Sequence, residues 1–307
     1  MQWNVGVQRQ LNSNTALTVE YVGMASQRLD YGGNVNAALT PGPGDPQSRA
    51  LYPYMPITPY DRPIGRSSYN AGQFAFERRY ADDFSYSVAY TWSKTIDTGA
   101  DGWWGTEGGT AQDAYCISCF GSRSVAGYDA TNMLSVDTLY QLPFGRGKRF
   151  STGNRALDYV VGGWQSNNIF IAHTGTPFTP LISSDIANVG GNQESLDIVG
   201  DPHLSHRSPS EWFNTDAYAV PAGYTYGTAG RNSLRGPDFW EWDTSIFRLI
   251  ELSNERQFEF RAEAFNVLNN VVLGQPINDY NTGPQFGTIN TTTNLARQIQ
   301  LALKFRF

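Results

Sequence analysis

Long hydrophobic runs are absent from this 307-residue sequence. A helix that spans a membrane needs about 18 or more consecutive apolar residues, and no segment of the chain supplies them. The longest segment without Asp, Glu, Lys or Arg covers residues 159–184 and contains the polar residues Gln165, Asn167 and Asn168. The sequence therefore does not predict a helical membrane protein.

Cysteine is also scarce. The two cysteines, Cys116 and Cys119, are too few for a disulfide framework. Their CxxC spacing occurs in redox motifs and in half of a zinc site, but the sequence has no second cysteine pair to complete such a site. In an exported loop, a local disulfide between the two cysteines is the favoured interpretation. Metal binding by this pair is the lesser alternative.

The sequence lacks an excess of positive charge and has no recognisable catalytic pattern. Its formal net charge is −6, which argues against a nucleic-acid partner because nucleic-acid binding needs a basic surface. His203 and His206 form an isolated HxxH pair, for which solvated loop histidines are the favoured interpretation. No nucleophile elbow supports a Ser–His–Asp site. We therefore expect no enzyme activity, no cofactor and no metal site.

The sequence is rich in aromatic residues and in alternating patterns. Aromatic residues make up 14% of the chain, although the mean hydropathy is −0.41. At the C-terminus, apolar residues occupy alternate positions, namely Ile299, Leu301, Leu303, Phe305 and Phe307. A period of two over this length predicts a strand of about 9–11 residues, enough to cross a bilayer at a tilt. A terminal strand that ends on Phe305 and Phe307 resembles the assembly signal of bacterial outer-membrane β-barrels.

The same alternation recurs along the chain and predicts nine strands. They lie near residues 3–11, 17–21, 73–79, 84–92, 134–142, 161–174, 242–246, 258–264 and 299–307. In the sixth strand, Asn167 and Asn168 interrupt the alternation. Residues 28–66 contain seven prolines among glycines, which predicts a long loop without a regular strand or helix.

The connections between these strands alternate in length. Short turns follow the first, third, fifth and seventh strands, and long loops follow the second, fourth, sixth and eighth. Outer-membrane barrels have short periplasmic turns and longer extracellular loops. The predicted fold class is therefore all-β, an antiparallel portion of a transmembrane β-barrel with its C-terminus in the periplasm. Because bacterial barrels have an even number of strands, we expect further strands upstream of residue 1.

Motifs in family order resemble the C-terminal barrel part of TonB-dependent outer-membrane receptors of the Oar-like group. They are YTWSK (90–94), LPFGRGK (142–148), GWQ (163–165) with TGTPF (174–178), WFN (212–214), GRNSLRGP (230–237), WD (242–243), RAEAFN (261–266) and RQIQ (297–300). The resemblance implies a barrel of about 22 strands, filled by an N-terminal plug and coupled to the inner membrane by a TonB box. Residues 1–307 would be its last nine strands. The plug, the TonB box, the early strands and an export signal are expected to be absent from these residues.

Aromatic residues in the long loops or at outer strand ends are the candidate solute-binding residues. They are Trp103, Trp104, Trp212, Phe213, Tyr224, Tyr226 and Trp240. Such side chains could stack on sugar rings or pack on a peptide at the barrel entrance. Alternatively, they form an outer aromatic girdle or pack within the loops.

Polar residues alternate with apolar residues on the last two strands and are the candidate lumen-facing set. They are Gln257, Glu259, Arg261, Glu263, Gln298, Gln300, Lys304 and Arg306. A lipid-facing Arg or Lys at the centre of a bilayer costs about 2–4 kcal/mol, so the alternation places these side chains in the lumen. Their expected role is to line the wall against the plug.

The functional expectation is a receptor in the bacterial outer membrane that takes up an unknown solute by energised transport. Its implied partners are outer-membrane lipid, the barrel assembly machinery and the TonB complex. One alternative is a passive porin-like or adhesive barrel. Another is a secreted all-β carbohydrate-binding protein.

Overall fold

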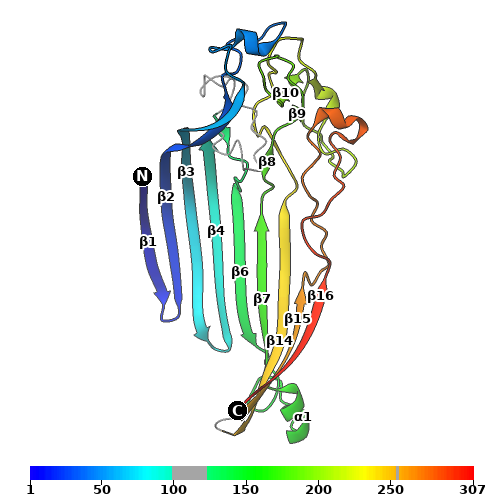
Figure 1. Cartoon of the computed structure of the whole chain (residues 1–307). Coiled ribbons are helices and arrows are strands. Elements are labelled where there is room, and N and C mark those ends of the chain that lie inside the picture. Colours follow the sequence, from blue (N-terminus) through cyan, green and yellow to red (C-terminus); the bar gives the residue numbers. More distant parts are fainter. Residues whose placement is uncertain (99–122, 254–255) are drawn as a thin grey trace.

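Nine long strands form one antiparallel sheet, which we call the main sheet (Figure 1). The computed structural model describes residues 1–98, 123–253 and 256–307. In spatial order the strands are β1 (Gln2–Asn12), β2 (Thr15–Val35), β3 (Thr58–Ala81), β4 (Phe84–Asp97), β6 (Asn132–Gln141), β7 (Trp164–His173), β14 (Phe239–Ser253), β15 (Arg256–Phe265) and β16 (Gln298–Arg306). The short β5 (Ser124–Val125) pairs with the end of β4. Sheet order follows chain order, and the nine predicted strands are confirmed.

Tight turns join β1 to β2 and β3 to β4 at one end of the main sheet. Between β3 and β4, Asp82 and Asp83 have φ values of 51° and 65°. Two successive residues in the left-handed region form the turn whose twist suits a two-residue hairpin. Between β1 and β2, the Asn12 side chain accepts a hydrogen bond from the Asn14 amide at 2.9 Å, which closes that turn locally. None of the helices among the described residues is long and apolar enough to cross a membrane.

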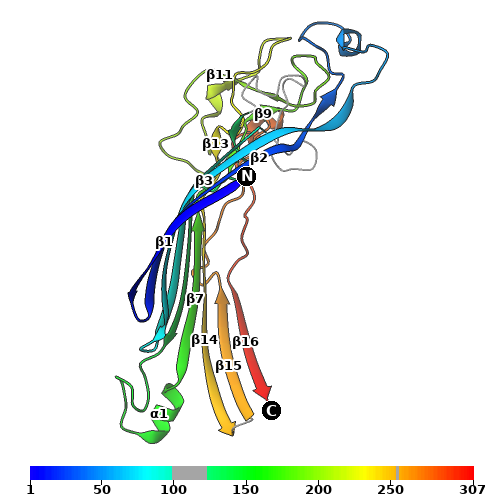
Figure 2. The same cartoon turned by 90° about the vertical axis from the view of Figure 1, so that its left-hand side faces the viewer.

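The predicted loop over residues 28–66 is wrong at both ends, because β2 and β3 extend into it. Asp30 lies opposite Pro63 and Asn34 lies opposite Pro59, so the two strands continue as a ribbon. Within the described residues, β3 pairs with β4 only from Ser67 onward, so this part of β3 has one free edge there. Proline is tolerated there because an edge strand needs no hydrogen-bond donor on its outer side. The ribbon carries the intervening segment and its short 3-10 helix η1 (Pro46–Arg49) beyond the end of the sheet (Figures 1 and 2).

The connection between β6 and β7 is longer than the predicted turn, and β7 begins at Trp164 instead of residue 161. Residues 155–161 form the helix α1 (Arg155–Val161). The Asn154 side chain caps α1 by accepting hydrogen bonds from two amides of its first turn. Gly145, in the LPFGRGK motif, has a φ of 101°, and a Cβ there would lie 2.6 Å from the Gly162 Cα. The motif thus lets two backbone segments pass in contact.

Strand register defines two faces of the main sheet, since residues opposite each other in paired strands lie on one face. Val88 lies opposite Val136, which lies opposite Phe170. We call this the apolar face; its members include Val7, Val19, Phe74, Tyr90, Leu134, Trp242, Phe260 and Leu301. We call the other the polar face; its members include Gln8, Glu77, Ser87, Asp137, Asp243, Glu263 and Gln300.

Asn168 interrupts the apolar face, as the sequence suggests. Its side-chain amide donates to the Thr138 hydroxyl at 3.2 Å, and its carbonyl accepts from the Thr244 hydroxyl at 2.7 Å. These partners come from the two strands that flank β7. The asparagine is therefore paired within the sheet, which limits the cost of placing an amide among apolar side chains.

The long connections at the other end of the sheet pack together as a body with its own core. We call residues 174–238 and 266–297 the loop module. They contain β8 (Pro177–Phe178), β9 (Leu181–Ile182), β10 (Glu194–Ser195), β11 (Asp197–Ile198), β12 (Tyr218–Ala219), β13 (Leu234–Arg235), and the 3-10 helices η2 (Thr215–Ala217) and η3 (Tyr280–Gln285). The core residues are Phe178, Ile182, Leu196, Phe213, Ala217, Tyr218, Ala229, Leu234 and Phe286. The largest buried apolar cluster of the described residues thus lies in the loops and not in the sheet.

Candidate functional site

Phe213 is a core residue of the loop module and not a surface for a ligand. Its side chain is 2% exposed, and its ring centroid lies 5.7 Å from that of Phe178 and 5.1 Å from that of Phe286. The neighbouring Trp212 packs against the same core and donates from Nε1 to the Arg235 carbonyl at 2.8 Å. Burial overturns the prediction that Phe213 contacts solute, because the closed aromatic core leaves no room for one.

The other predicted aromatic residues are scattered. Tyr224 is 48% exposed at a loop position with a φ of 63°. Tyr226 packs against the small cluster formed by Ala38, Ala187 and Val189. Trp240 lies in β14 on the apolar face, with its ring centroid 6.3 Å from that of Phe170, a position that suits the girdle alternative. Trp103, Trp104, Cys116 and Cys119 lie outside the described residues.

Two arginines of the GRNSLRGP motif attach the loop module to the strand ends, a role that sequence analysis missed. Arg231 forms a buried ion pair with Asp97, the last residue of β4. Arg235 donates to the Asp129 carboxylate at 2.5 Å and also to the backbone carbonyls of Asp129 and Gly175. The Asp129 side chain is fully buried and accepts from the Thr95 amide at 2.6 Å. Buried charges need such partners, so the motif serves assembly of the loops.

A second pair of carboxylates lies within the loop module, with Glu194 buried and Asp185 half-buried. Both oxygens of Glu194 accept from the Ala187 amide, at 3.0 and 3.1 Å, and the residue is 2% exposed. Asp185 accepts from the amides of Val189 and Gly190 at 2.9 and 2.7 Å. Burial, together with the neighbouring charge of Asp185, raises the pKa of Glu194 from 4.5 to about 7. This carboxyl therefore titrates near neutral pH.

The predicted lumen-facing residues of β15 and β16 lie together on the polar face. Glu259 lies opposite Lys304, Gln257 opposite Arg306, Glu263 opposite Gln300, and Gln298 opposite Phe265. Arg261 lies 2.8 Å from the Glu259 carboxylate and 3.3 Å from that of Glu263, and Arg306 lies 3.6 Å from Glu259. We call Glu259, Arg261, Glu263 and Arg306 the ion ladder. That it lines a lumen stays a prediction.

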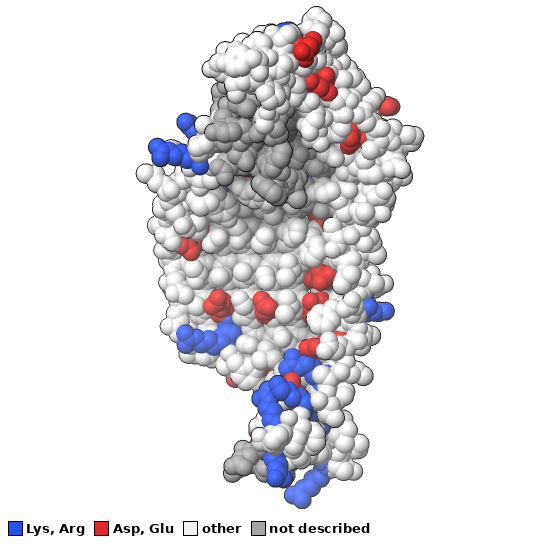
Figure 3. All heavy atoms as spheres, viewed as in Figure 1, with Lys and Arg blue, Asp and Glu red and all other residues white. Residues whose placement is uncertain are grey.

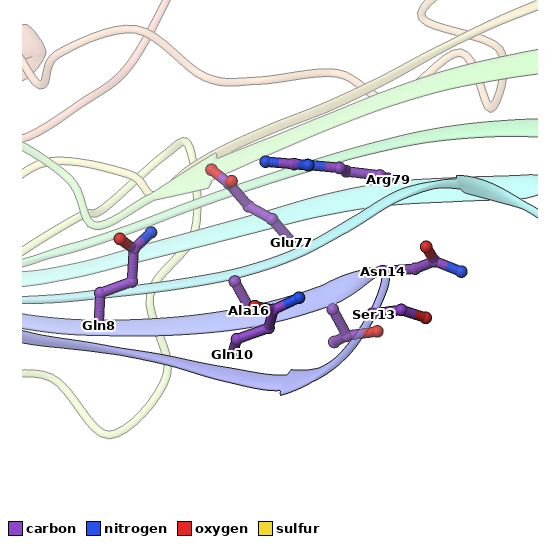
Figure 4. Close-up of a pocket in the computed structure, with 8 residues that line it drawn as sticks. Gln8, Gln10, Ser13, Asn14, Ala16, Glu77 and Arg79 are labelled. Carbon is purple, nitrogen blue, oxygen red and sulfur yellow. The ribbon is translucent and has the colours of Figure 1, made fainter.

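The polar face also carries a shallow cavity at its turn end, between β1, β2 and β3 (Figure 4). Its lining is almost entirely polar and includes Gln8, Gln10, Ser13, Asn14, Glu77 and Arg79. These side chains offer both donors and acceptors, with one charge of each sign. Figure 3 shows further Asp and Glu side chains across the same face of the sheet. The polar face therefore suits contact with water or with a polar protein segment, and it is unsuited to hydrocarbon.

An antiparallel sheet with one apolar and one polar face, short turns at one end and long packed loops at the other is the wall of an outer-membrane β-barrel. The chain matches the outer membrane beta barrel domain family over residues 1–300, and it belongs to that family. The protein is thus a bacterial outer-membrane protein. No curated protein matches the chain.

Among solved structures, an outer membrane transporter shows the same fold. The outer membrane transporter YddB from Escherichia coli superposes with a TM-score of 0.53 and 10% identity, over 100% of this chain and 32% of that chain. FpvA of P. aeruginosa, in complex with a heterologous pyoverdine and iron, gives a TM-score of 0.46 and 9% identity, over 100% of this chain and 26% of that one. The chain therefore spans about a third or less of the length of these proteins. At 10% identity, the likeness to YddB shows the fold alone.

Proposed function

We propose that this chain is part of the barrel of a TonB-dependent receptor of the Oar-like group, which takes up a solute by energised transport. In this proposal the main sheet is part of a wall of about 22 strands. The polar face lines the lumen, and the loop module stands at the outer opening. The observation that carries the proposal is the superposition of the whole chain on a segment of the YddB transporter.

The polar face supports a lumen that is filled by protein. Its ion ladder presents alternating charges that a plug domain can contact, whereas exposure of the same residues to lipid would cost about 2–4 kcal/mol for each Arg or Lys at mid-bilayer. The shallow cavity lined by Gln8, Glu77 and Arg79 offers further hydrogen-bonding groups on that face. Solute capture is assigned to the outward surface of the loop module, where Tyr224 is exposed.

Conductance of the full-length protein in planar bilayers tests this proposal against a passive porin-like barrel. A plugged receptor shows no steady ion conductance, and removal of its plug opens a large channel. We also expect the full-length protein to retain a purified TonB C-terminal domain on an affinity column. If the intact protein shows steady conductance and does not retain the TonB domain, the proposal is wrong and the protein is a passive porin-like barrel.

A further inference from the structure

α1 turns its polar side inward and its apolar side outward. Asp158 is 6% exposed, and its carboxylate accepts hydrogen bonds from the Thr152 amide at 2.7 Å and the Thr152 hydroxyl at 2.9 Å. Leu157, Tyr159 and Val160 are 52%, 61% and 62% exposed. A surface helix in water has the opposite arrangement. The outward side of α1 therefore suits an apolar medium.

α1 is held on the apolar face of the main sheet. Arg248 donates to the Val160 carbonyl at 2.9 Å, and its guanidinium lies 4.9 Å from the centroid of the Tyr159 ring. The Trp164 indole donates to the same carbonyl at 3.0 Å. Arg248 lies opposite both Trp164 and Phe260, which are members of the apolar face. Figure 2 shows α1 below β7, at the turn end of the sheet.

The segment before α1 adds further exposed apolar area and exposed positive charges. The rings of Phe144 and Phe150 lie 5.6 Å apart and are 43% and 50% exposed. Arg146, Arg149 and Arg155 are exposed as well. The connection over residues 142–163 contains four basic residues and one acidic residue, in a chain whose net charge is −6. Figure 3 shows the Lys and Arg side chains gathered at this end of the molecule.

We propose that residues 142–163 form an interfacial anchor that binds anionic phospholipid headgroups in the periplasm-facing leaflet of the outer membrane. The short turns of an outer-membrane barrel lie on the periplasmic side, and the apolar face meets lipid. Leu157, Val160 and the two phenylalanines enter the boundary between headgroups and acyl chains. Arg146, Arg149 and Arg155 reach the phosphates above them. The anchor is independent of whether the barrel transports a solute.

Two features favour lipid over a second protein as the occupant. The outward side of α1 is continuous with the apolar face, which in a barrel is the lipid-facing surface. Exposed arginines that flank aliphatic and aromatic residues are the composition of helices that lie in the membrane interface. Long basic side chains at such a depth extend their charged ends to the headgroups. Each of them adds attraction to an anionic surface.

Depth measurement tests the position of the anchor. In the full-length protein with Cys116→Ser and Cys119→Ser, a fluorophore is attached to Val160→Cys and the protein is reconstituted into vesicles. We expect phospholipids that carry a spin label near the headgroup to quench this fluorophore strongly. The matched control is a fluorophore at Ser210→Cys, an exposed residue of the loop module, which stays unquenched. Heat-modifiable gel mobility shows that each variant is folded.

The difference in quenching between anionic and zwitterionic lipids tests the role of the three arginines. In vesicles that contain equal amounts of phosphatidylglycerol and phosphatidylcholine, spin-labelled phosphatidylglycerol should quench the Val160→Cys fluorophore at least about threefold more than spin-labelled phosphatidylcholine. Replacement of Arg146, Arg149 and Arg155 by alanine should bring the ratio close to one. Replacement of Arg123, Arg207 and Arg297, which lie near the loop end, should leave it unchanged.

Two outcomes would overturn the proposal. The first is an unquenched fluorophore at Val160→Cys in folded protein, above all if a photocrosslinker at the same position joins a second copy or another protein. The second is equal quenching of the Val160→Cys fluorophore by both spin-labelled lipids when Arg146, Arg149 and Arg155 are present. A quenching ratio that stays the same after these three arginines are replaced by alanine would have the same meaning.

Discussion

The main sheet and the loop module place their apolar side chains in opposite environments. In the sheet, Trp92 and Ile246 on the apolar face are 63% and 44% exposed, whereas Leu196 and Phe213 in the module are 0% and 2% exposed. Burial of apolar surface contributes roughly 25 cal/mol per Å². The module obtains this contribution in water from its own core. The sheet obtains it only when lipid covers its apolar face, so the two regions are stable in different solvents and can be disrupted separately.

The largest effect is expected from Phe213→Ala, which removes the centre of the module core. Truncation of a buried Phe costs about 3–5 kcal/mol, and the free energy of unfolding of the module should fall by that amount. Hydrogen exchange of peptides from residues 174–238 measures the loss, while heat-modifiable mobility of the sheet stays unchanged. Tyr224→Ala, at an exposed position, is the control. Undiminished protection in Phe213→Ala would show that the module depends on the sheet for its stability.

Arg231→Ala removes the connection between the two regions. It removes the guanidinium that forms an ion pair with the buried Asp97 carboxylate, and breaking a buried ion pair from one side costs about 3 kcal/mol or more. Hydrogen exchange should accelerate at the end of β4 while the module core stays protected. The double replacement Arg231→Met with Asp97→Leu removes both charges and should recover most of the protection. Failure of the double variant to recover would mean that the hydrogen bonds of Arg231 matter more than the charge balance.

A matched pair of substitutions in β6 tests the two faces of the sheet. Val136→Arg on the apolar face should reduce the stability of the membrane-inserted barrel by about 2–4 kcal/mol. Ser135→Arg, one residue away on the polar face, should have little effect. The folded fraction in vesicles, measured by heat-modifiable mobility across a urea series, reports both variants. Equal losses would contradict the assignment of the apolar face to lipid.

The smallest effect concerns pH and distinguishes the module from the sheet once more. Because the folded-state pKa of Glu194 is raised from 4.5 to about 7, the protonated carboxyl stabilises the module. This contribution is fully present below pH 4.5 and is lost as the pH rises through about 7. We expect module stability to decline over that window by at most about 3 kcal/mol. Glu194→Gln should abolish it; an unaltered pH profile in this variant would assign the effect to another group.

Strand alternation made most of the sheet predictable. The nine strands, their order and the two faces follow from local periodicity, because each strand pairs with its neighbour in sequence. The extension of β2 and β3 could not be predicted. Proline is excluded from a central strand but tolerated on an edge strand, and only the structure shows that the pairing of β3 with β4 stops at Ser67. α1 was missed because its seven residues are too short for a helical period and its apolar residues face outward.

The candidate site was predicted less well. The residues of the ion ladder were named correctly as neighbours, since the spacing along two adjacent strands determines their register. The role of Phe213 was mistaken, because an aromatic residue in a long loop gives no local sign of whether it is buried. Arg231 and Arg235 were assigned no structural role, although their motif was recognised. Their partners, Asp97 and Asp129, lie about a hundred residues away in sequence, beyond the reach of any local pattern.

The sequence by itself determined the alternation, and with it which side chains share a face and which ends of the sheet carry turns or loops. These properties depend on the period of two of an extended chain and on neighbours that are close in sequence. Only the tertiary structure decided which loop aromatics form a core, which arginines attach that core to the strands, and on which face α1 lies. Those outcomes depend on contacts between distant segments, where burial and charge pairing compete across the whole fold.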